Sequence, residues 1–270
     1  MRVERRGFDQ LPDEIRAAVQ TQVGADCRST DMATGESSGV AALLFLADGS
    51  RVFVKGLPDG HERARELDAE ARVNPFLPGY APRLLWRLAA GGWTLLGFEG
   101  VTATPWADFT PGSGHLEPVA AVLHDLSTRT APGLKTVWDR WGSYCEPADE
   151  ALLDGRCLVH GDPVATNFLV GDRVWLVDWA WAAQGPAWAD ATLWGFRLVL
   201  DGHHAPEQAH ERALTIPAFA AAPRRGVRVL AEAEARSWED WQAYGTPGID
   251  VIAKAARAWA DYVNGLPERQ

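Results

Sequence analysis

The sequence predicts an α+β fold, with β-strands concentrated in the first part of the chain and helices in the rest. Three observations support this prediction: two β-hairpin patterns before residue 100, a set of helical patterns that dominates after it, and a polar loop between two short apolar runs at 157–177. With 270 residues, the chain is long enough for one large domain or two small ones. Its 47% hydrophobic and 23% charged residues are typical of a soluble globular protein.

The strands are predicted from alternating apolar segments joined by short turns. Asp48-Gly49 lies between two apolar runs, which predicts antiparallel strands over Val40–Ala47 and Arg51–Lys55. Two further strands are expected at Arg83–Leu88 and Trp93–Phe98, joined by a small-residue turn.

The helices are predicted from apolar residues that recur at helical spacing. In the segment that starts at Leu116, for example, Val119, Leu123 and Leu126 return to the same face. The segment over 62–76 is mostly charged, which indicates a solvated face. A mainly apolar helix is expected to begin at Asp190. The other predicted helices are Leu11–Val23, Glu62–Phe76, Leu116–Ser127, Leu214–Phe219, Val227–Tyr244 and Ile249–Gly265.

Charge and cysteine content restrict the partners and the compartment. The net charge of −10 argues against nucleic acid and anionic membranes as partners, and it is compatible with a cationic small substrate. Three cysteines without metal-ligand spacing predict reduced thiols in a cytoplasmic protein. No secretory signal and no bilayer-spanning run is expected, and both a monomer and a homodimer stay open.

The polar loop carries the residues on which the functional prediction depends. His160, Gly161 and Asp162 follow a short apolar run, Asn167 comes five residues after Asp162, and Asp178 ends the next apolar run. Carboxylate and amide oxygens at a strand mouth are the ligands that Mg²⁺ prefers, and an aspartate that binds no metal can accept a proton from a hydroxyl. An ordinary polar hairpin loop is the alternative.

This pattern resembles the catalytic core of the protein-kinase superfamily, in which H-R-D-x-x-x-x-N precedes a metal-binding aspartate. With Gly161 in place of the arginine and Trp179 after Asp178, it is more similar to the aminoglycoside phosphotransferase family. The resemblance implies a bilobal protein-kinase-like fold: a nucleotide-binding lobe over 1–98, a hinge over 99–104 and a helical lobe over 105–270 with the acceptor site. It also implies that Asp162 is the catalytic base, that Asn167 and Asp178 bind Mg²⁺, and that His160 and Asp190 support the loop. A helix N-cap is the alternative role for Asp190.

The resemblance extends to the nucleotide site. Lys55 ends a V-F-V-K strand and is expected to contact the phosphates of ATP or GTP, with Glu70 as its ion-pair partner and Glu66 as the alternative. The Gly/Ser loop can cradle phosphate with its amides, although most such turns bind nothing. The backbone of the hinge is expected to contact the adenine, although a plain strand-to-helix loop has the same sequence features. The further nucleotide-binding residues predicted are Gly35, Ser37, Ser38, Gly39, Phe98, Glu99 and Val101.

The segment between Asp178 and Asp190 is too short for a long activation loop, which favours a hydroxylated small molecule, such as an aminoglycoside or another antibiotic, over a protein acceptor. A nucleotide-binding pseudokinase and, less favoured, a protein kinase are the alternatives. Acceptor contacts are predicted for aromatic and acidic residues, with a solvated acidic helix face as the competing interpretation: Trp179, Trp181, Glu232 and Asp240.

Overall fold

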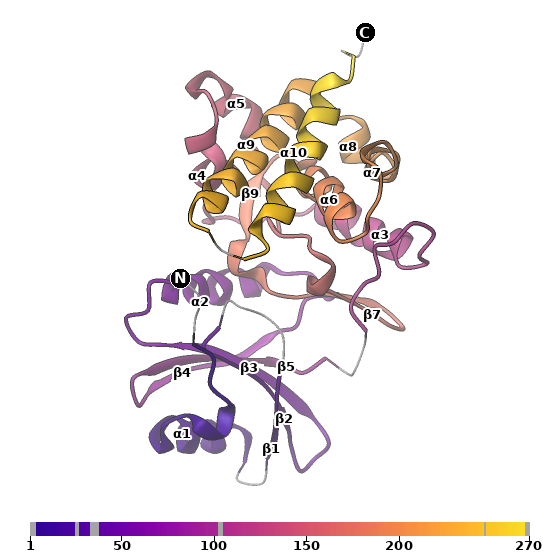
Figure 1. The fold of residues 1–270 in the computed structure, drawn as a ribbon. Coiled ribbons are helices and arrows are strands. Elements are labelled where there is room, and N and C mark those ends of the chain that lie inside the picture. The colour runs from indigo at the N-terminus through magenta and orange to yellow at the C-terminus, as the bar shows by residue number, and fades with distance from the viewer. Residues whose placement is uncertain (1–3, 25–26, 33–37, 102–104, 246, 268–270) are drawn as a thin grey trace. The chain divides into compact units, whose positions relative to one another are not determined.

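A computed structural model describes residues 4–24, 27–32, 38–101, 105–245 and 247–267. The chain forms two compact units. Unit 1 comprises residues 1–104 together with 177–180, and unit 2 comprises 105–176 and 181–270. Unit 1 contains a five-stranded antiparallel sheet, and unit 2 is mostly helical. The predicted α+β fold is therefore confirmed (Figure 1).

The sheet of unit 1 has the strand order β1-β2-β3-β5-β4, and all of its pairs are antiparallel. The predicted hairpin at Asp48-Gly49 is confirmed, because β2 and β3 pair from Val40 opposite Gly56 to Phe45 opposite Arg51. The second predicted hairpin is confirmed as β4 and β5. The strands are β1 (Arg28–Asp31), β2 (Val40–Phe45), β3 (Arg51–Pro58), β4 (Leu84–Ala90) and β5 (Trp93–Glu99).

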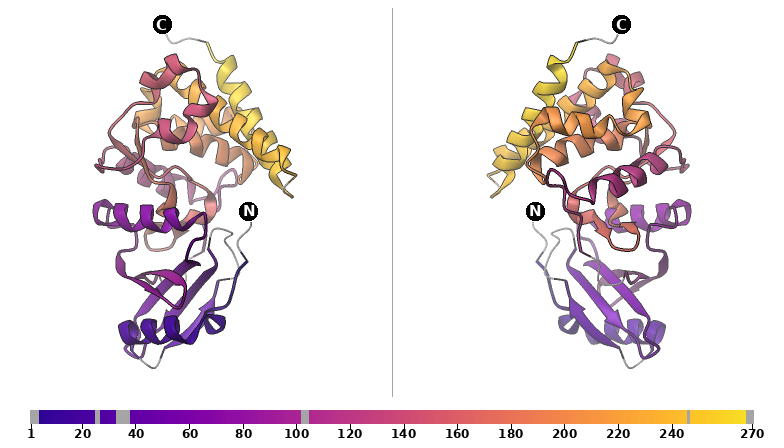
Figure 2. Two further views of the ribbon diagram at one scale, coloured as in Figure 1. Left: turned by 90° about the vertical axis from the view of Figure 1, so that its left-hand side faces the viewer. Right: turned by 90° about the vertical axis from the view of Figure 1, so that its right-hand side faces the viewer.

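One helix covers each face of this sheet: α1 (Asp13–Val23) packs on one side and α2 (Ala64–Val73) on the other (Figures 1 and 2). Side chains of a strand alternate between the two faces. Val54 of β3 accordingly packs with Ile15 of α1, and Leu57 of β3 packs with Leu67 of α2. Lys55 lies two residues before Leu57 and therefore faces α2.

Two details of unit 1 differ from the prediction. The edge strand β1 was not expected, because its sequence Arg-Ser-Thr-Asp has no apolar alternation; it forms through pairing with β2. The helix expected over 62–76 is α2 followed by the 3₁₀ turn η2 (Asn74–Phe76), since Pro75 cannot donate the next helical hydrogen bond. A further 3₁₀ turn, η1 (Phe8–Gln10), precedes α1.

Unit 2 is built around α6 (Ala189–Leu200), which is buried along most of its length. The two longest helices, α9 (Arg224–Ala243) and α10 (Ile249–Gly265), lie side by side and both contact α6 (Figure 2). The remaining helices are α3 (Leu116–Leu126), α4 (Val137–Trp141), α5 (Glu150–Leu153), α7 (Pro206–Ala213) and α8 (Pro217–Ala220), with the 3₁₀ turns η3 (Gly142–Tyr144) and η4 (Pro147–Asp149).

Among the helices after residue 200, apolar periodicity predicted some correctly and failed for others. The prediction over Ile249–Gly265 is confirmed residue for residue. The helix expected over Leu214–Phe219 is wrong, because the chain turns there and a short helix starts at Pro217. Helix α7 was missed, since its surface is polar and gives little apolar periodicity.

Two small two-stranded sheets flank the polar loop of unit 2. Strand β6 (Cys157–Val159) pairs with β9 (Ala183–Gly185), and β7 (Phe168–Val170) pairs with β8 (Val174–Leu176). The loop between β6 and β7 contains the 3₁₀ turn η5 (Ala165–Asn167), and a further turn, η6, spans Trp179–Trp181. Among the described helices, none is long and apolar enough to cross a bilayer.

Candidate functional site

Unit 1 holds a buried lysine between two carboxylates. Lys55 Nζ lies 2.5 Å from Glu70 Oε2 and 2.9 Å from Asp178 Oδ1. Glu70 is the residue of α2 that faces the sheet, between the buried Leu67 and Val73 at helical spacing. Glu66, the alternative considered from sequence, instead pairs with Arg63 on its own helix.

Burial and charge act in opposite directions on this lysine. Burial opposes the positive charge of Lys55, but the nearby Asp178 and Glu70 outweigh it and raise the pKa of the ammonium. Lys55 is therefore a fixed positive charge on the central strand β3, held in place by Glu70. Asp178 adopts a left-handed conformation with φ of 62° and keeps 35% of its side chain exposed. Such a conformation is costly for a residue other than glycine and is often found at functional sites.

The predicted phosphate loop is only partly described. Gly35 and Ser37 lie outside the described residues. Ser38 is buried and lines a small cavity with Lys55, Glu70 and Asp178; its volume of about 10 Å³ corresponds to roughly one water.

The prediction that the amide of Gly39 cradles phosphate needs correction. Its N–H donates to Gly56 O at 2.8 Å, so the amide is used in the sheet. A Cβ at this position would lie 3.1 Å from the Trp93 ring. Glycine here allows close packing against Trp93, and its amide is occupied by the sheet.

The predicted hinge begins where β5 ends. Phe98 is buried against the α2 side of the sheet, with Lys55 Nζ 6.0 Å from its ring centroid. The amide of Glu99 donates to Arg83 O and that of Gly100 to Arg51 O, so neither N–H is directed at an adenine in this structure. Val101 is half-buried and is the last described residue before 105.

Unit 2 holds the catalytic-loop residues predicted from His160 onward. His160 is fully buried, and the buried Asp190 of α6 accepts hydrogen bonds from the amides of His160 and Gly161 at 2.7 and 2.9 Å. Burial raises the pKa of Asp190, against the attraction of His160 and of these two amides. Asp190 thus fixes the backbone that leads into Asp162.

Asp162 is fixed by a residue that sequence reasoning missed. Arg197 Nη2 donates to Asp162 Oδ1 at 2.7 Å, and the Asp162 side chain keeps 25% of its surface exposed. The side-chain amide of Asn167 donates to Asp162 O at 3.0 Å. The Asp162 carboxylate is therefore oriented by a charged hydrogen bond while it still reaches solvent.

The loop is held by one face of α6. Asp190, Arg197 and Asp201 are seven and four residues apart, so they return to the same side of a helix. Asp201 Oδ2 accepts from the amide of Ala165 at 3.3 Å, three residues after Asp162. The helix thereby contacts the loop before, at and after Asp162.

The donor chemistry of the predicted metal ligands fits Mg²⁺. Because the Asn167 Nδ2 donates to Asp162, its carbonyl oxygen is the group that remains for a cation, and Asp178 supplies a partly exposed carboxylate. Within the described ranges, no three His, Cys, Asp or Glu side chains form a cluster that could hold a metal alone. The convergence of Asp162, Asn167 and Asp178 stays a prediction, since Asp178 belongs to unit 1 and the other two to unit 2.

The predicted acceptor residues separate into different roles. Trp179 is 2% exposed and its amide donates to Glu70, so the prediction that its side chain contacts an acceptor is corrected to a packing role. Trp181 is half-buried and stacks on Arg140, with the guanidinium carbon 3.7 Å from the ring centroid. Asp240 is exposed on α9 beside Tyr144.

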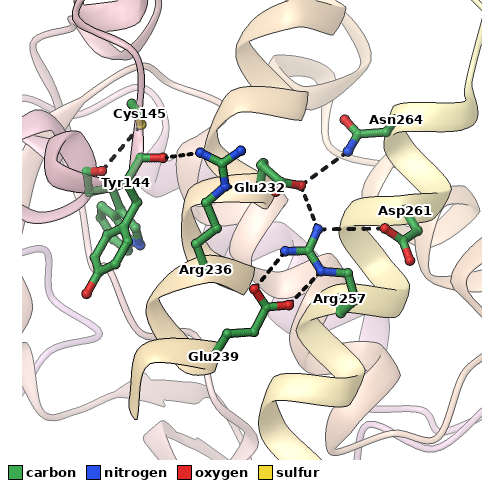
Figure 3. A network of polar contacts seen from close by, with 9 residues as sticks. Tyr144, Cys145, Glu232, Arg236, Glu239, Arg257, Asp261 and Asn264 are labelled. Atoms are coloured by element: carbon green, nitrogen blue, oxygen red, sulfur yellow. Dashed lines mark hydrogen bonds and ion pairs between the residues drawn. The ribbon is translucent and has the colours of Figure 1, made fainter. Parts of the chain in front are cut away.

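Glu232 belongs to an ion-pair network between α9 and α10 (Figure 3). Arg257 of α10 donates to Glu232 and Glu239, both at 2.7 Å, and Arg236 donates to Glu232 at 3.0 Å. Glu232 lines a cavity of about 190 Å³ at this end of the unit, but its carboxylate already holds two arginines. The prediction that it binds an acceptor amine is therefore corrected: it holds two helices together.

Replacing Arg257 with methionine is expected to lower the free energy of unfolding by about 1–2 kcal/mol, because two carboxylates would lose charged hydrogen bonds. Urea denaturation measures this loss. The control Arg129→Met removes an exposed (i, i+4) pair with Asp125 and should cost less. Equal losses in the two variants would contradict a special role for the network.

On the prediction that Asp162 is the catalytic base, an Arg197→Met variant is expected to lower kcat by up to about 100-fold at unchanged affinity for nucleotide, because small displacements of a catalytic group are costly. Arg197→Lys keeps the charge and should recover part of the rate. The exposed Arg156→Met serves as the control. A wild-type kcat for Arg197→Met would show that Arg197 does not position the base.

Comparisons with known proteins show which proteins share this fold. No protein-family model and no curated protein matches the sequence. Solved structures match over nearly the whole chain. The aminoglycoside phosphotransferase APH(4)-Ia, in a complex with ADP and hygromycin B, is 14% identical with a TM-score of 0.61 over 94% of this chain and 99% of its own. The chain has the fold of the small-molecule kinases.

Two further kinase-like structures support the same fold. The choline kinase LicA from Streptococcus pneumoniae is 14% identical, with a TM-score of 0.61 over 92% of this chain and 99% of its own. The macrolide 2'-phosphotransferase MphH from Brachybacterium faecium is 18% identical, with a TM-score of 0.57 over 94% and 98%. At these identities the likeness establishes the fold.

Proposed function

We propose that this protein is an ATP-dependent phosphotransferase that moves the γ-phosphoryl group of Mg·ATP to a hydroxyl of a small molecule. The observation that carries the proposal is the fixed carboxylate of Asp162, oriented by Arg197 and by a backbone that Asp190 holds. A carboxylate that is oriented and partly exposed can align a hydroxyl and accept its proton.

Each unit supplies one part of the chemistry in this proposal. In unit 1, Lys55 offers a fixed ammonium to the nucleotide phosphates, and Glu70 keeps it from moving. When bound, Mg²⁺ would neutralise phosphate oxygens, with Asn167 and Asp178 as its protein ligands. In unit 2, Asp162 accepts the proton of the acceptor hydroxyl. Because phosphoryl transfer has a loose transition state, placement and charge neutralisation are the main contributions of these residues.

The acceptor is proposed to be small. Between Asp178 and α6 the chain forms only the turn η6 and the three-residue strand β9, which leaves no room for a long segment that could hold a peptide. The similar structures include enzymes named for an aminoglycoside, for choline and for a macrolide. An antibiotic or another hydroxylated metabolite is therefore the acceptor class that we propose.

Radiolabelled transfer tests the proposal directly. The full chain is incubated with γ-labelled ATP, Mg²⁺ and a panel of hydroxylated antibiotics, sugars and amino alcohols, and label in the acceptor is measured. Prior thermal-shift screening selects the panel, since a ligand of the folded state raises its apparent stability. We expect Mg-dependent label transfer. Nucleotide binding without transfer to any member would instead favour a pseudokinase, and transfer to a peptide library alone would favour a protein kinase.

A further inference from the structure

Arg140 is an arginine held rigidly beside the catalytic loop. It lies on α4, whose start is fixed by hydrogen bonds between Thr136 and Asp139. Its guanidinium carbon lies 4.1 Å from the ring centroid of Trp141 and 3.7 Å from that of Trp181. Guanidinium groups stack well on indoles, and two such contacts restrict the side chain to a single orientation.

One edge of this guanidinium is bound to the loop itself. Arg140 Nη1 donates to Gly161 O at 2.8 Å, one residue before Asp162. Gly161 has a φ of 81°, and a Cβ there would lie 2.7 Å from Trp181 O and 3.3 Å from Arg140 Nη1. Because Gly161 has no side chain, Arg140 and Trp181 can lie directly next to its backbone. The arginine and the proposed base are thus fixed on the same short segment.

The charge of Arg140 has no carboxylate in contact within the described parts of the chain. Glu234, the acid with the largest electrostatic effect on Arg140, is buried and accepts hydrogen bonds from the indoles of Trp141 and Trp238 at 2.5 and 2.8 Å. Burial lowers the pKa of Arg140, and the charges of Glu234 and Asp162 oppose this effect. Arg197, the neighbouring cation, differs because it is paired directly with Asp162.

The remaining donors of Arg140 are not fully sealed from solvent. Its side chain is half-buried, and none of its nitrogens is both sealed from solvent and without a hydrogen bond. An arginine presents its donors in a planar fork that matches carboxylate and phosphate oxygens. A fork that is already fixed by stacking loses little side-chain freedom when it binds.

We propose that Arg140 is a preformed receptor for an oxyanion beside the catalytic loop, and that the acceptor carries this group as a carboxylate or phosphate. The assignment of the oxyanion to the acceptor rests on the proposed function, whereas the existence of the oxyanion site does not. The terminal phosphate of the nucleotide is the alternative oxyanion for this site. The acceptor is favoured because Arg140 is bound to the segment that orients the acceptor hydroxyl, while Lys55 of unit 1 is the cation proposed for the nucleotide.

Titration with inorganic phosphate and with acetate at constant ionic strength tests the site. The full chain is labelled with ¹⁵N-arginine, and the guanidinium resonance assigned to Arg140 is followed. We expect saturable binding that is weakened at least about tenfold, or 1.4 kcal/mol, in Arg140→Gln. Because the variants at this position lack the Arg140 resonance, their binding is compared with that of the wild type by intrinsic tryptophan fluorescence, and Arg140→Lys should bind with intermediate affinity. Arg225→Gln, which removes a 67% exposed guanidinium, should bind as wild type.

Absence of saturable binding in the wild type, or equal binding by wild type and the folded Arg140→Lys and Arg140→Gln variants, would overturn the oxyanion site. A second titration, in saturating Mg·AMP-PNP, separates the sources. Phosphate and acetate binding that persists supports an acceptor group, whereas binding that disappears assigns Arg140 to the nucleotide and overturns the acceptor assignment. Neither titration requires phosphoryl transfer, so failure of the oxyanion site is distinguishable from failure of the proposed activity.

Discussion

An Asp162→Asn variant is expected to lose about 10³-fold in kcat, within the range that removal of a general base costs. Asparagine has nearly the same shape but cannot accept the proton of the acceptor hydroxyl. It also leaves Arg197, whose side chain is only 9% exposed, without its charged partner. A stability loss of about 1–3 kcal/mol should therefore accompany the loss of rate.

Two measurements separate these effects. Single-turnover phosphoryl transfer gives the chemical rate, and calorimetry gives the affinity for Mg·ATP, which should be nearly unchanged. Asp154→Asn, an exposed acid upstream of β6, is the matched control and should behave as wild type. If Asp162→Asn binds nucleotide and transfers phosphate at the wild-type rate, Asp162 is not the base.

An Asp178→Asn variant is expected to weaken Mg·ATP binding by at least about tenfold, the lower range of what even an outer-shell change costs a metal site. The change removes the charged oxygen proposed to bind Mg²⁺. Lys55 would keep its closer partner Glu70, so unit 1 should still fold. The variant thus tests metal binding with little effect on the fold.

Titration calorimetry with Mg·ATP and with metal-free ATP measures the expected difference. The metal-dependent part of the affinity should fall, while metal-free binding should change little or improve, because one negative charge beside the phosphates is gone. Asp172→Asn, in the exposed turn between β7 and β8, provides the control. Unchanged metal dependence in Asp178→Asn would remove Asp178 from the metal site.

The sequence predicted much of the fold because its local signals agree with the tertiary structure. The Asp48-Gly49 turn and the apolar periodicity of Ile249–Gly265 each specify their element without help from distant residues. The strand β1 and the helix α7 were missed for the opposite reason: their residues are mainly polar, and packing or pairing elsewhere in the chain decides their conformation.

The site residues that could be predicted are likewise those with a local signal, and the residues that were missed depend on distant contacts. Glu70 could be chosen because α2 repeats its inward face at Leu67, Glu70 and Val73. Arg197 and Arg140 could not be assigned a role, since each meets the loop across more than 20 residues of sequence. Among the described residues, neither has an ion-pair partner on its own helix that would have indicated its orientation. A buried arginine in an apolar helix is the signal that could have directed attention to Arg197. Gly39 was misassigned because a glycine required for packing and one required for ligand approach look identical in sequence.

The hydrogen bonds between α6 and the loop also restrict which insertions the chain can tolerate. Inserting one residue between Asp190 and Arg197 would rotate the guanidinium by about 100° around the helix and carry it away from Asp162. Chain length should therefore be fixed across this stretch, whereas surface loops elsewhere can lengthen freely. Deep mutational scanning with single-codon insertions would display that contrast as a narrow intolerant window from Asp190 to Asp201.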